Sequence, residues 1–200
     1  MVNLISKQGK TGENVSQRDN ILRVSAALFA EKGYQAVGVA EIGEAVRLGR
    51  GALYYHIGSK EELLFDIVIQ YITSLVSVGT QILRDVDSPE ERSRELSRHM
   101  RLVVVDNLSE LSVCFRETES LTGQRHQDVA AQHAKYQGLW AETLADGYKK
   151  GVFRLLPPVA LKGLLGMYFH SFLWLNPHGK STAREIADIF SDMVLRAARD

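Results

Sequence analysis

The distribution of proline is the feature that most restricts the fold of this chain. The sequence has 4 prolines in 200 residues, and none of them precedes Pro89. Proline removes a backbone donor and breaks helices, so its absence leaves long segments free to form uninterrupted helix. Apolar residues recur at helical spacing, and no segment alternates as a half-buried strand does. The sequence therefore predicts an all-α fold.

Local signals place about nine helices along the chain. Glu62 follows Ser59 by three residues, and Glu185 follows Thr182 in the same way, which is the capping-box pattern of a helix start. Glycine is typical of a helix end, and Gly33 stands where the first apolar pattern stops. The expected helices cover 18–32, 39–46, 50–56, 59–83, 88–107, 110–121, 127–150, 159–175 and 183–199.

The lengths of these helices divide the chain into two parts. We expect a flexible arm and a small helical domain within 1–60, and a larger helical domain over 61–200. Residues 1–60 hold eight Lys/Arg and five Asp/Glu, a balance of +3, and the remaining residues hold 16 and 19, a balance of −3. The small part is therefore mildly basic and the larger part mildly acidic.

No segment indicates export or a membrane span. The first residues lack an apolar run long enough for a signal peptide. The densest apolar segment, 164–175, contains His170 and is too short to cross a bilayer. Cys114 is the only cysteine, so no internal disulfide can form, which fits a reducing compartment. We expect a soluble cytoplasmic protein with no membrane partner.

One side of the expected helix at 50–56 is free for an external partner. Short helices must be held by their apolar sides, which leaves small and polar groups facing outward at the start of this helix. A helix-turn-helix enters the DNA major groove with such a surface. The candidate DNA contacts are Ala40, Arg47, Arg50, Gly51, Ala52, Tyr54, Tyr55, His56 and Lys60. The alternative is that Tyr54 packs in the core and Lys60 is solvated.

Residues 21–64 carry a recognisable motif, ILRVSAALFAEKGYQAVGVAEIGEAVRLGRGALYYHIGSKEELL. This segment resembles the DNA-binding domain of the TetR family of bacterial transcriptional regulators. The resemblance implies a homodimer that binds a palindromic operator in double-stranded DNA through its third helix. The remaining helices would form a ligand-binding and dimerisation domain.

Four positions depart from the family pattern. Gly38 stands where a threonine usually caps the second helix, and Arg47 replaces the turn glycine. Gly49 replaces a serine, and Ile57 replaces a phenylalanine. The geometry of the turn and the caps of two short helices therefore differ from the usual ones, and Arg47 is either a phosphate contact or a solvated side chain.

An apolar stripe near the C-terminus provides a candidate dimer surface. Gly163 and Gly166 permit close approach of another helix. The last helix adds Ile186, Ile189, Phe190, Met193, Val194 and Ala197. By the resemblance, the last two helices of such regulators pair in a four-helix bundle. The alternative is that either set serves only the core of the monomer.

The region 115–174 combines aromatic walls with a few polar groups, as a small-molecule pocket does. The candidate ligand contacts are Phe115, Arg116, Glu119, Tyr136, Trp140, Leu144, Tyr148, Met167, His170 and Trp174. Arg116, Arg125 and His126 are candidates for holding an anionic group. Plain core packing is the alternative for the aromatic residues, and solvation is the alternative for Arg125.

The layout of this region is similar to the ligand domains of regulators of steroid, fatty-acid and aromatic-acid breakdown, several of which respond to acyl-CoA thioesters. The sequence thus predicts a repressor released from its operator by an acyl-CoA or another hydrophobic acid. The competing class is an all-α metal-dependent enzyme of the helical-bundle type. The Glu-x-x-His pairs of a di-iron bundle are absent, so no metal, cofactor or catalytic residue is expected. An adaptor protein would leave the DNA-binding motif unexplained.

Overall fold

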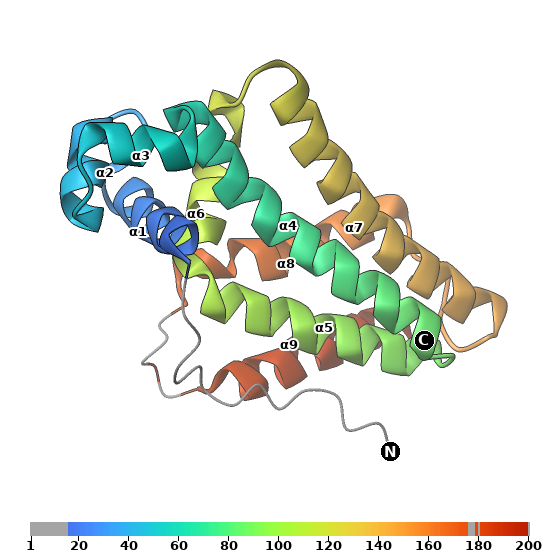
Figure 1. The fold of residues 1–200 in the computed structure, drawn as a ribbon. Coiled ribbons are helices and arrows are strands. Elements are labelled where there is room, and N and C mark those ends of the chain that lie inside the picture. Colours follow the sequence, from blue (N-terminus) through green and yellow to red (C-terminus); the bar gives the residue numbers. More distant parts are fainter. Residues whose placement is uncertain (1–15, 176–178, 180, 200) are drawn as a thin grey trace.

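The computed structural model describes residues 16–175, 179 and 181–199, and this part of the chain is all-α (Figure 1). The expected arm lies almost entirely outside the described residues. The helices are α1 (Gln17–Lys32), α2 (Val39–Val46), α3 (Arg50–Ile57), α4 (Lys60–Asp85), α5 (Pro89–Asp106), α6 (Leu108–Glu117), α7 (Gly123–Lys149), α8 (Pro158–Phe169) and α9 (Ala183–Ala198). The predicted fold class is confirmed, and each expected helix is found.

Predicted caps explain where two of the helices begin. At α4, Ser59 Oγ accepts a hydrogen bond from the Glu62 backbone N–H at 3.0 Å. At α9 the pairing is reciprocal. Thr182 Oγ1 accepts from the Glu185 backbone N–H at 3.2 Å, and the Glu185 carboxylate accepts from the Thr182 backbone N–H at 2.7 Å. Such bonds satisfy donors that the first helical turn leaves free.

Two helices end earlier than the sequence predicted. The helix expected at 110–121 is α6, which stops at Glu117 and is followed by a 3-10 turn, Thr118–Ser120. The helix expected at 159–175 is α8, which stops at Phe169 and continues as a 3-10 turn, His170–Leu173. Tightening of the last turn is common at helix ends, and apolar periodicity does not distinguish the two geometries over three or four residues.

Helices α1 to α3 pack around a small core of their own, which includes Ile21, Phe29, Ile42 and Leu53. Helix α4 runs from this domain along the larger one and packs against α5 and α7, while α9 lies against α5 (Figure 1). By length and composition α4 is apolar enough to cross a membrane, but 50% of its most apolar window is buried inside the fold. This burial is that of a core helix.

The start of α4 belongs to the small domain as well. Arg18 on α1 forms an ion pair with Asp66 on α4 and donates a hydrogen bond to the carbonyl of His56 near the end of α3. One side chain thus fixes α3 relative to α1 and α4. The division of domains at residue 60 stays a prediction, because a continuous helix begins there and serves both parts.

Candidate DNA interface and effector pocket

The turn between α2 and α3 forms with an arginine in place of the usual glycine. Arg47 adopts the left-handed conformation (φ 57°, ψ 40°), and its backbone N–H donates to the Glu44 carbonyl at 3.1 Å. The close approach occurs at Gly43, where a Cβ would lie 2.9 Å from the Leu48 carbonyl oxygen. Glycine is therefore required at 43, whereas Arg47 holds a conformation that glycine adopts more easily.

We expect Arg47→Gly to stabilise the protein by up to about 1 kcal/mol. The left-handed conformation costs an L-residue roughly 1–2 kcal/mol of folding free energy, and glycine avoids this cost. Glycine also makes the unfolded chain more flexible, which offsets part of the stabilisation. If the guanidinium contacts a phosphate, the same change weakens DNA binding. Thermal unfolding measures the first effect and a gel shift the second. A lower melting temperature would contradict the argument from backbone strain.

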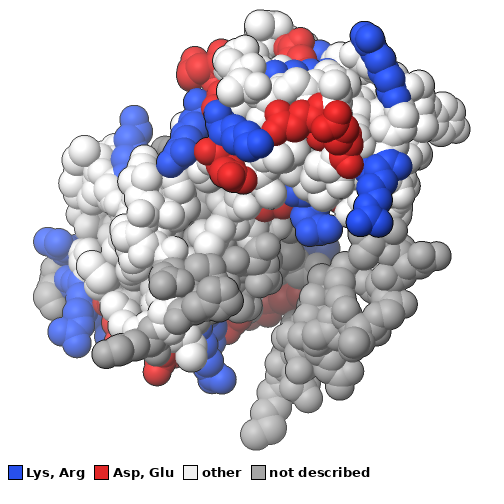
Figure 2. Space-filling view, turned by 90° about the vertical axis from the view of Figure 1, so that its left-hand side faces the viewer, with Lys and Arg blue, Asp and Glu red and all other residues white. Residues whose placement is uncertain are grey.

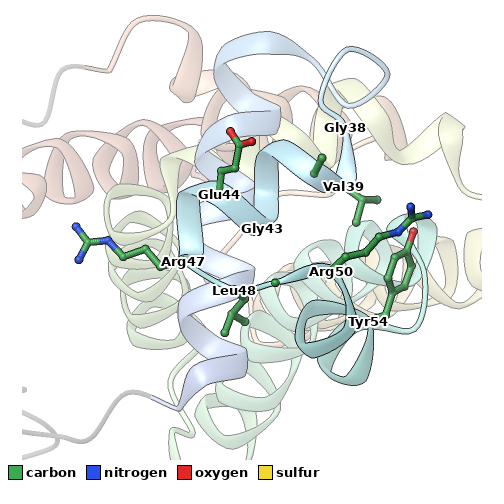
Figure 3. Close-up of a pocket in the computed structure, with 10 residues that line it drawn as sticks. Gly38, Val39, Gly43, Glu44, Arg47, Leu48, Arg50 and Tyr54 are labelled. Atoms are coloured by element: carbon green, nitrogen blue, oxygen red, sulfur yellow. The ribbon is translucent and has the colours of Figure 1, made fainter.

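A cleft of about 620 Å³ lies between α2 and α3 (Figure 3). Its lining residues are Gly38, Val39, Ala40, Gly43, Glu44, Arg47, Leu48, Gly49, Arg50 and Tyr54. Gly38 and Gly49 are the N-caps of the two helices, and neither provides a side-chain cap. The first backbone N–H groups of α2 and α3 are therefore available to an external acceptor, and helix N-termini favour anions. This geometry suits a DNA phosphate.

The outer side of α3 is free, as predicted. Leu53 and Ile57 are buried in the core, while Tyr55 is 86% exposed. The Arg50 guanidinium lies 5.7 Å from the centre of the Tyr54 ring, and Figure 3 shows the two side chains together beside the cleft. Among the candidate DNA contacts, Ala40, Arg47, Arg50, Gly51, Ala52, Tyr54 and Tyr55 are exposed, and His56 and Lys60 are half-buried. The exposure of Tyr54 argues against its packing in the core.

Charges on this end of the molecule are mixed (Figure 2). Lys and Arg side chains are interspersed with Asp and Glu side chains on this face. One acidic residue, Glu44, lies in the cleft itself. A uniform positive field is therefore absent from the face shown, and Arg50 remains a candidate for an individual DNA contact.

Lys60 is held by the protein rather than free in solvent. Its Nζ lies 4.3 Å from the centre of the Tyr34 ring, a cation–π contact. Burial lowers the pKa of Lys60, and the nearby Glu117 carboxylate opposes that effect. The Tyr34 ring therefore positions the ammonium before any DNA is bound. The sequence alone did not indicate this contact.

Two carboxylates connect the small domain with the larger one. Glu117, at the end of α6, accepts a hydrogen bond from the Tyr34 backbone N–H at 3.1 Å. Glu61 on α4 accepts hydrogen bonds from the backbone N–H and the hydroxyl of Thr122 at 3.1 and 2.9 Å. Arg125, a candidate for holding an anionic ligand, pairs with Glu61 at 3.3 Å instead. These partners are 61 to 83 positions apart, so no local pattern pointed to them.

Four of the candidate ligand contacts, Tyr136, Trp140, Leu144 and Tyr148, recur at steps of four along α7, and this stripe turns from the core to the surface. Tyr136, Trp140 and Leu144 are buried, but Tyr148 is 50% exposed. A step of four residues rotates about 40° beyond a full helical turn, so three steps place Tyr148 about 120° away from Tyr136. Only the first part of the stripe faces the interior.

The other candidate ligand contacts divide in the same way. Phe115 packs against Phe169 with ring centres 5.3 Å apart, and Tyr136 contacts the same ring at 6.3 Å. Met167 is partly buried against the core. The remaining candidates, Arg116, Glu119, His170 and Trp174, lie at or near the surface, with Trp174 59% exposed. Their exposure sets these four apart from the buried aromatic residues of the larger domain.

Five buried polar atoms on α4, α5 and α7 have no hydrogen-bond partner. They are Tyr71 Oη, His99 Nε2, Gln132 Oε1, Tyr136 Oη and Trp140 Nε1. The Trp140 indole lies near the Tyr136 oxygen, but no hydrogen bond of normal geometry joins them. An unpaired buried polar group costs about 1–3 kcal/mol, so such atoms are expected where a ligand or water binds. The sequence reasoning missed Tyr71, His99 and Gln132, because a single polar group within a helical stripe looks like core.

The groups around these atoms are uncharged near neutral pH. Burial raises the pKa of Tyr71 and that of Tyr136 well above the usual value, and it raises the pKa of Cys114 to about 11. Burial also lowers the pKa of His99 and that of His133, so both imidazoles are neutral at pH 7. The interior of the larger domain therefore offers hydrogen bonds without charge.

Comparison with known proteins places both regions in one family. The family model for the tetracyclin repressor-like C-terminal domain matches residues 86–198, and the model for bacterial regulatory proteins of the tetR family matches residues 21–67. The chain belongs to the TetR family. The resemblance carried by residues 21–64 is thereby confirmed.

Relatives within the TetR family are similar over nearly the whole chain. The transcriptional repressor KstR2 of Mycobacterium tuberculosis is 25% identical over 187 residues, which span 92% of this chain and 94% of that protein. The structure of PfmR from Thermus thermophilus has a TM-score of 0.83 at 30% identity, covering 91% of this chain and 100% of that one. AibR in complex with isovaleryl coenzyme A and operator DNA has a TM-score of 0.79 at 29% identity, covering 89% and 97%.

TetR-family membership decides between the competing classes. The chain is a DNA-binding transcriptional regulator, and the helical-bundle enzyme is excluded. Among the described residues, no group of three or more His, Cys, Asp and Glu side chains could hold a metal ion.

The candidate dimer stripe of this TetR-family protein is split by its fold. Phe190 and Val194 are buried in the monomer, where α9 packs on α5. Ile189 and Met193, one helical turn apart, are 55% and 49% exposed. Of the rest, Gly163 is exposed, and Gly166, Ile186 and Ala197 are half-buried. The alternative of a core role thus holds for Phe190 and Val194, while Ile189 and Met193 are free to meet a second copy.

Proposed function

We propose that this TetR-family protein is a repressor that binds a palindromic operator as a homodimer in the cytoplasm and is released by a CoA thioester. The observation that supports DNA binding most directly is α3, whose apolar side is fixed in the core while its polar side is exposed. Among the relatives, KstR2 is a transcriptional repressor, and AibR was solved with operator DNA and isovaleryl coenzyme A. The effector class rests on these relatives and on the unpaired polar atoms of the larger domain.

In this proposal, the two helices of the motif divide the work on DNA. Arg50 and Tyr55 lie on the exposed side of α3 and contact base edges in the major groove. The free N-termini of α2 and α3, at the cleft, bind a phosphate of the backbone. Small residues at the start of α3, Gly51 and Ala52, let the helix enter the groove.

Lys60 is proposed to exchange the Tyr34 ring for a DNA phosphate. Lys60→Ala should therefore weaken binding to all duplexes alike. A plot of the logarithm of the DNA association constant against the logarithm of salt concentration should also become less steep. The slope should fall by about 0.9 for each phosphate that is no longer neutralised, and a dimer should lose roughly two. Lys149→Ala, an exposed lysine near the far end of α7, is the matched control. An unchanged salt slope would show that Lys60 serves only the contact with Tyr34.

The dimer is proposed to form through the exposed side of α9 together with α8. Ile189 and Met193 supply the apolar contact, and Gly163 allows the helices to approach closely. One α3 reads too few bases alone, and two copies must face the same side of the duplex, about 34–36 Å apart. The spacing of the two α3 helices therefore controls affinity for the operator.

Helix α6 is proposed to transmit effector binding to the spacing of the two α3 helices. Phe115 lies in the aromatic cluster of the larger domain, and Glu117, two residues on, holds the Tyr34 backbone of the small domain. An effector that moves α6 thus acts on the loop after α1. Coupling of this kind is typically worth about 1–3 kcal/mol, which corresponds to roughly 5–150-fold weaker operator binding.

Glu117→Ala should remove most of this coupling. In this variant the Tyr34 N–H loses its acceptor and Lys60 loses the nearby carboxylate. The ligand should still bind, but its effect on operator affinity should fall to less than about twofold. The control is Glu119→Ala. Glu119 is two residues after Glu117 and its side chain is 94% exposed, so its removal should leave the coupling intact. Equal coupling in both variants would contradict a role for the Glu117 contact.

The test of the proposed function is a gel shift on DNA that flanks the protein's own gene, with and without isovaleryl-CoA and longer acyl-CoA thioesters. We expect a complex whose stoichiometry is two chains per palindrome and which dissociates as thioester is added. Binding of random duplexes with equal affinity would reject the operator. A complex that persists at saturating thioester would reject release by this effector class.

A further inference from the structure

We propose that the end of the effector that enters the larger domain is uncharged and carries an oxygen that accepts hydrogen bonds from Tyr71 and Tyr136. A thioester, ester or ketone meets this requirement, and a free carboxylate does not. The inference rests on the proposed effector site and specifies the chemistry that the site selects.

The hydrogen-bond donors come from two helices that pack together. Tyr71 is on α4, and Tyr136 and Trp140 are on α7; their polar atoms are buried and unpaired. Burial is the main cause of the raised pKa of Tyr71, so its phenol keeps its proton at neutral pH and can act as a donor. Phenol O–H and indole N–H groups donate hydrogen bonds, and they match a carbonyl oxygen.

The described side chains of the larger domain include no buried lysine or arginine that could pair with a carboxylate. None of the Lys and Arg side chains that the structure describes is buried, and the fully buried polar residues other than tyrosine and tryptophan are serines and a threonine. An ionised carboxylate that enters such an interior loses its hydration, and the neutral phenol and indole donors do not neutralise its charge. The uncharged ester of the same acid keeps the chain and its carbonyl oxygen and avoids this penalty.

The apolar part of the ligand has a matching surface. The Phe169 ring lies next to Tyr136, with ring centres 6.3 Å apart, and Phe115 packs against Phe169 with ring centres 5.3 Å apart. An acyl chain that packs against Phe169 would bring its carbonyl near the Tyr136 phenol. The CoA portion, which is strongly anionic, would remain at the surface, where the cations of the larger domain are.

The experiment compares isovaleric and octanoic acids with their methyl esters and CoA thioesters by isothermal titration of the full chain at pH 7.5. For the chain length that binds, the methyl ester should bind at least about 100-fold more tightly than the free acid, since burial without a cationic partner raises the pKa of a carboxylic acid by about two units or more. An acid that binds as tightly as its methyl ester would overturn the inference, while release by a thioester could still be observed.

Two variants test the donors. Tyr71→Phe and Tyr136→Phe should each weaken the binding of methyl ester about tenfold, because each removes one hydrogen bond to the ligand. Neither should lower the melting temperature of the unliganded protein, because the hydroxyl that each removes is buried without a partner. Operator binding without ligand should be unchanged in both.

Full ester affinity in both variants would overturn the inference, and so would the absence of binding by every ester and thioester. A protein that does not bind the operator at all would instead reject the proposed function.

Discussion

Arg50→Ala is expected to weaken binding to the preferred operator by about 2–6 kcal/mol per dimer and to relax discrimination among operators. An arginine that contacts a base edge typically contributes about 1–3 kcal/mol, and a dimer carries two copies. Arg50 is exposed at the first position of α3, where a helix-turn-helix makes its base contacts. The Tyr54 ring, 5.7 Å from the guanidinium, restricts its orientation before DNA arrives.

The matched control for Arg50→Ala is Arg23→Ala, which removes the same charge from the same domain. Arg23 is exposed on α1 and bonded to Asn20 at 3.0 Å, on a helix that does not enter the groove. Both variants are to be titrated against the operator and against single-base variants of it. Uniform weakening by Arg50→Ala across all duplexes would make Arg50 a phosphate contact. An affinity equal to that of the control would remove it from the interface.

Met193→Glu is expected to abolish the dimer at micromolar concentration and to lower operator affinity at least about 100-fold. Met193 is 49% exposed in the monomer, on the side of α9 that faces away from the core. In a twofold interface the new carboxylate is buried twice without a partner, and such desolvation is strongly unfavourable. The monomer itself should remain folded, because Phe190 and Val194 still pack against α5.

Light scattering and circular dichroism measure the two consequences of Met193→Glu, and Met193→Leu is the control of similar volume. The control should remain a dimer with unchanged operator binding. A folded, dimeric Met193→Glu protein with full affinity for the operator would show that this side of α9 is not the dimer interface. Loss of helical signal in Met193→Glu would mean that the residue supports the monomer.

Helix positions were predictable because their signals are local. The bounds of α2, Val39–Val46, agree with the apolar spacing of that segment, and α4 begins after Ser59 because Ser59 and Glu62 are one turn apart. The free side of α3 followed from the same spacing, since Leu53 and Ile57 must face inward. The dimer and the effector class, by contrast, came from the resemblance to a family.

The candidate pocket was predictable only in part, because spacing along one helix does not identify its partners. Tyr148 was grouped with Tyr136 at steps of four, but the helix rotates it to the surface. Tyr71 was passed over because it lies within the apolar stripe of α4, and only its burial without a hydrogen-bond partner distinguishes it from core. Similarly, α9 packs against α5 and buries Phe190 and Val194 of its apolar stripe, which the spacing along α9 alone did not reveal.

The amino-acid sequence by itself determined the helices, the caps of α4 and α9, and the exposed side of α3, because each depends on residues within about one helical turn. Only the tertiary structure decided that Lys60 lies on the Tyr34 ring, that Glu117 holds the Tyr34 backbone, and that two helices which pack together, α4 and α7, each bury an unpaired tyrosine hydroxyl. These contacts join residues far apart in the chain, so their partners are set by how the helices pack and not by any local pattern.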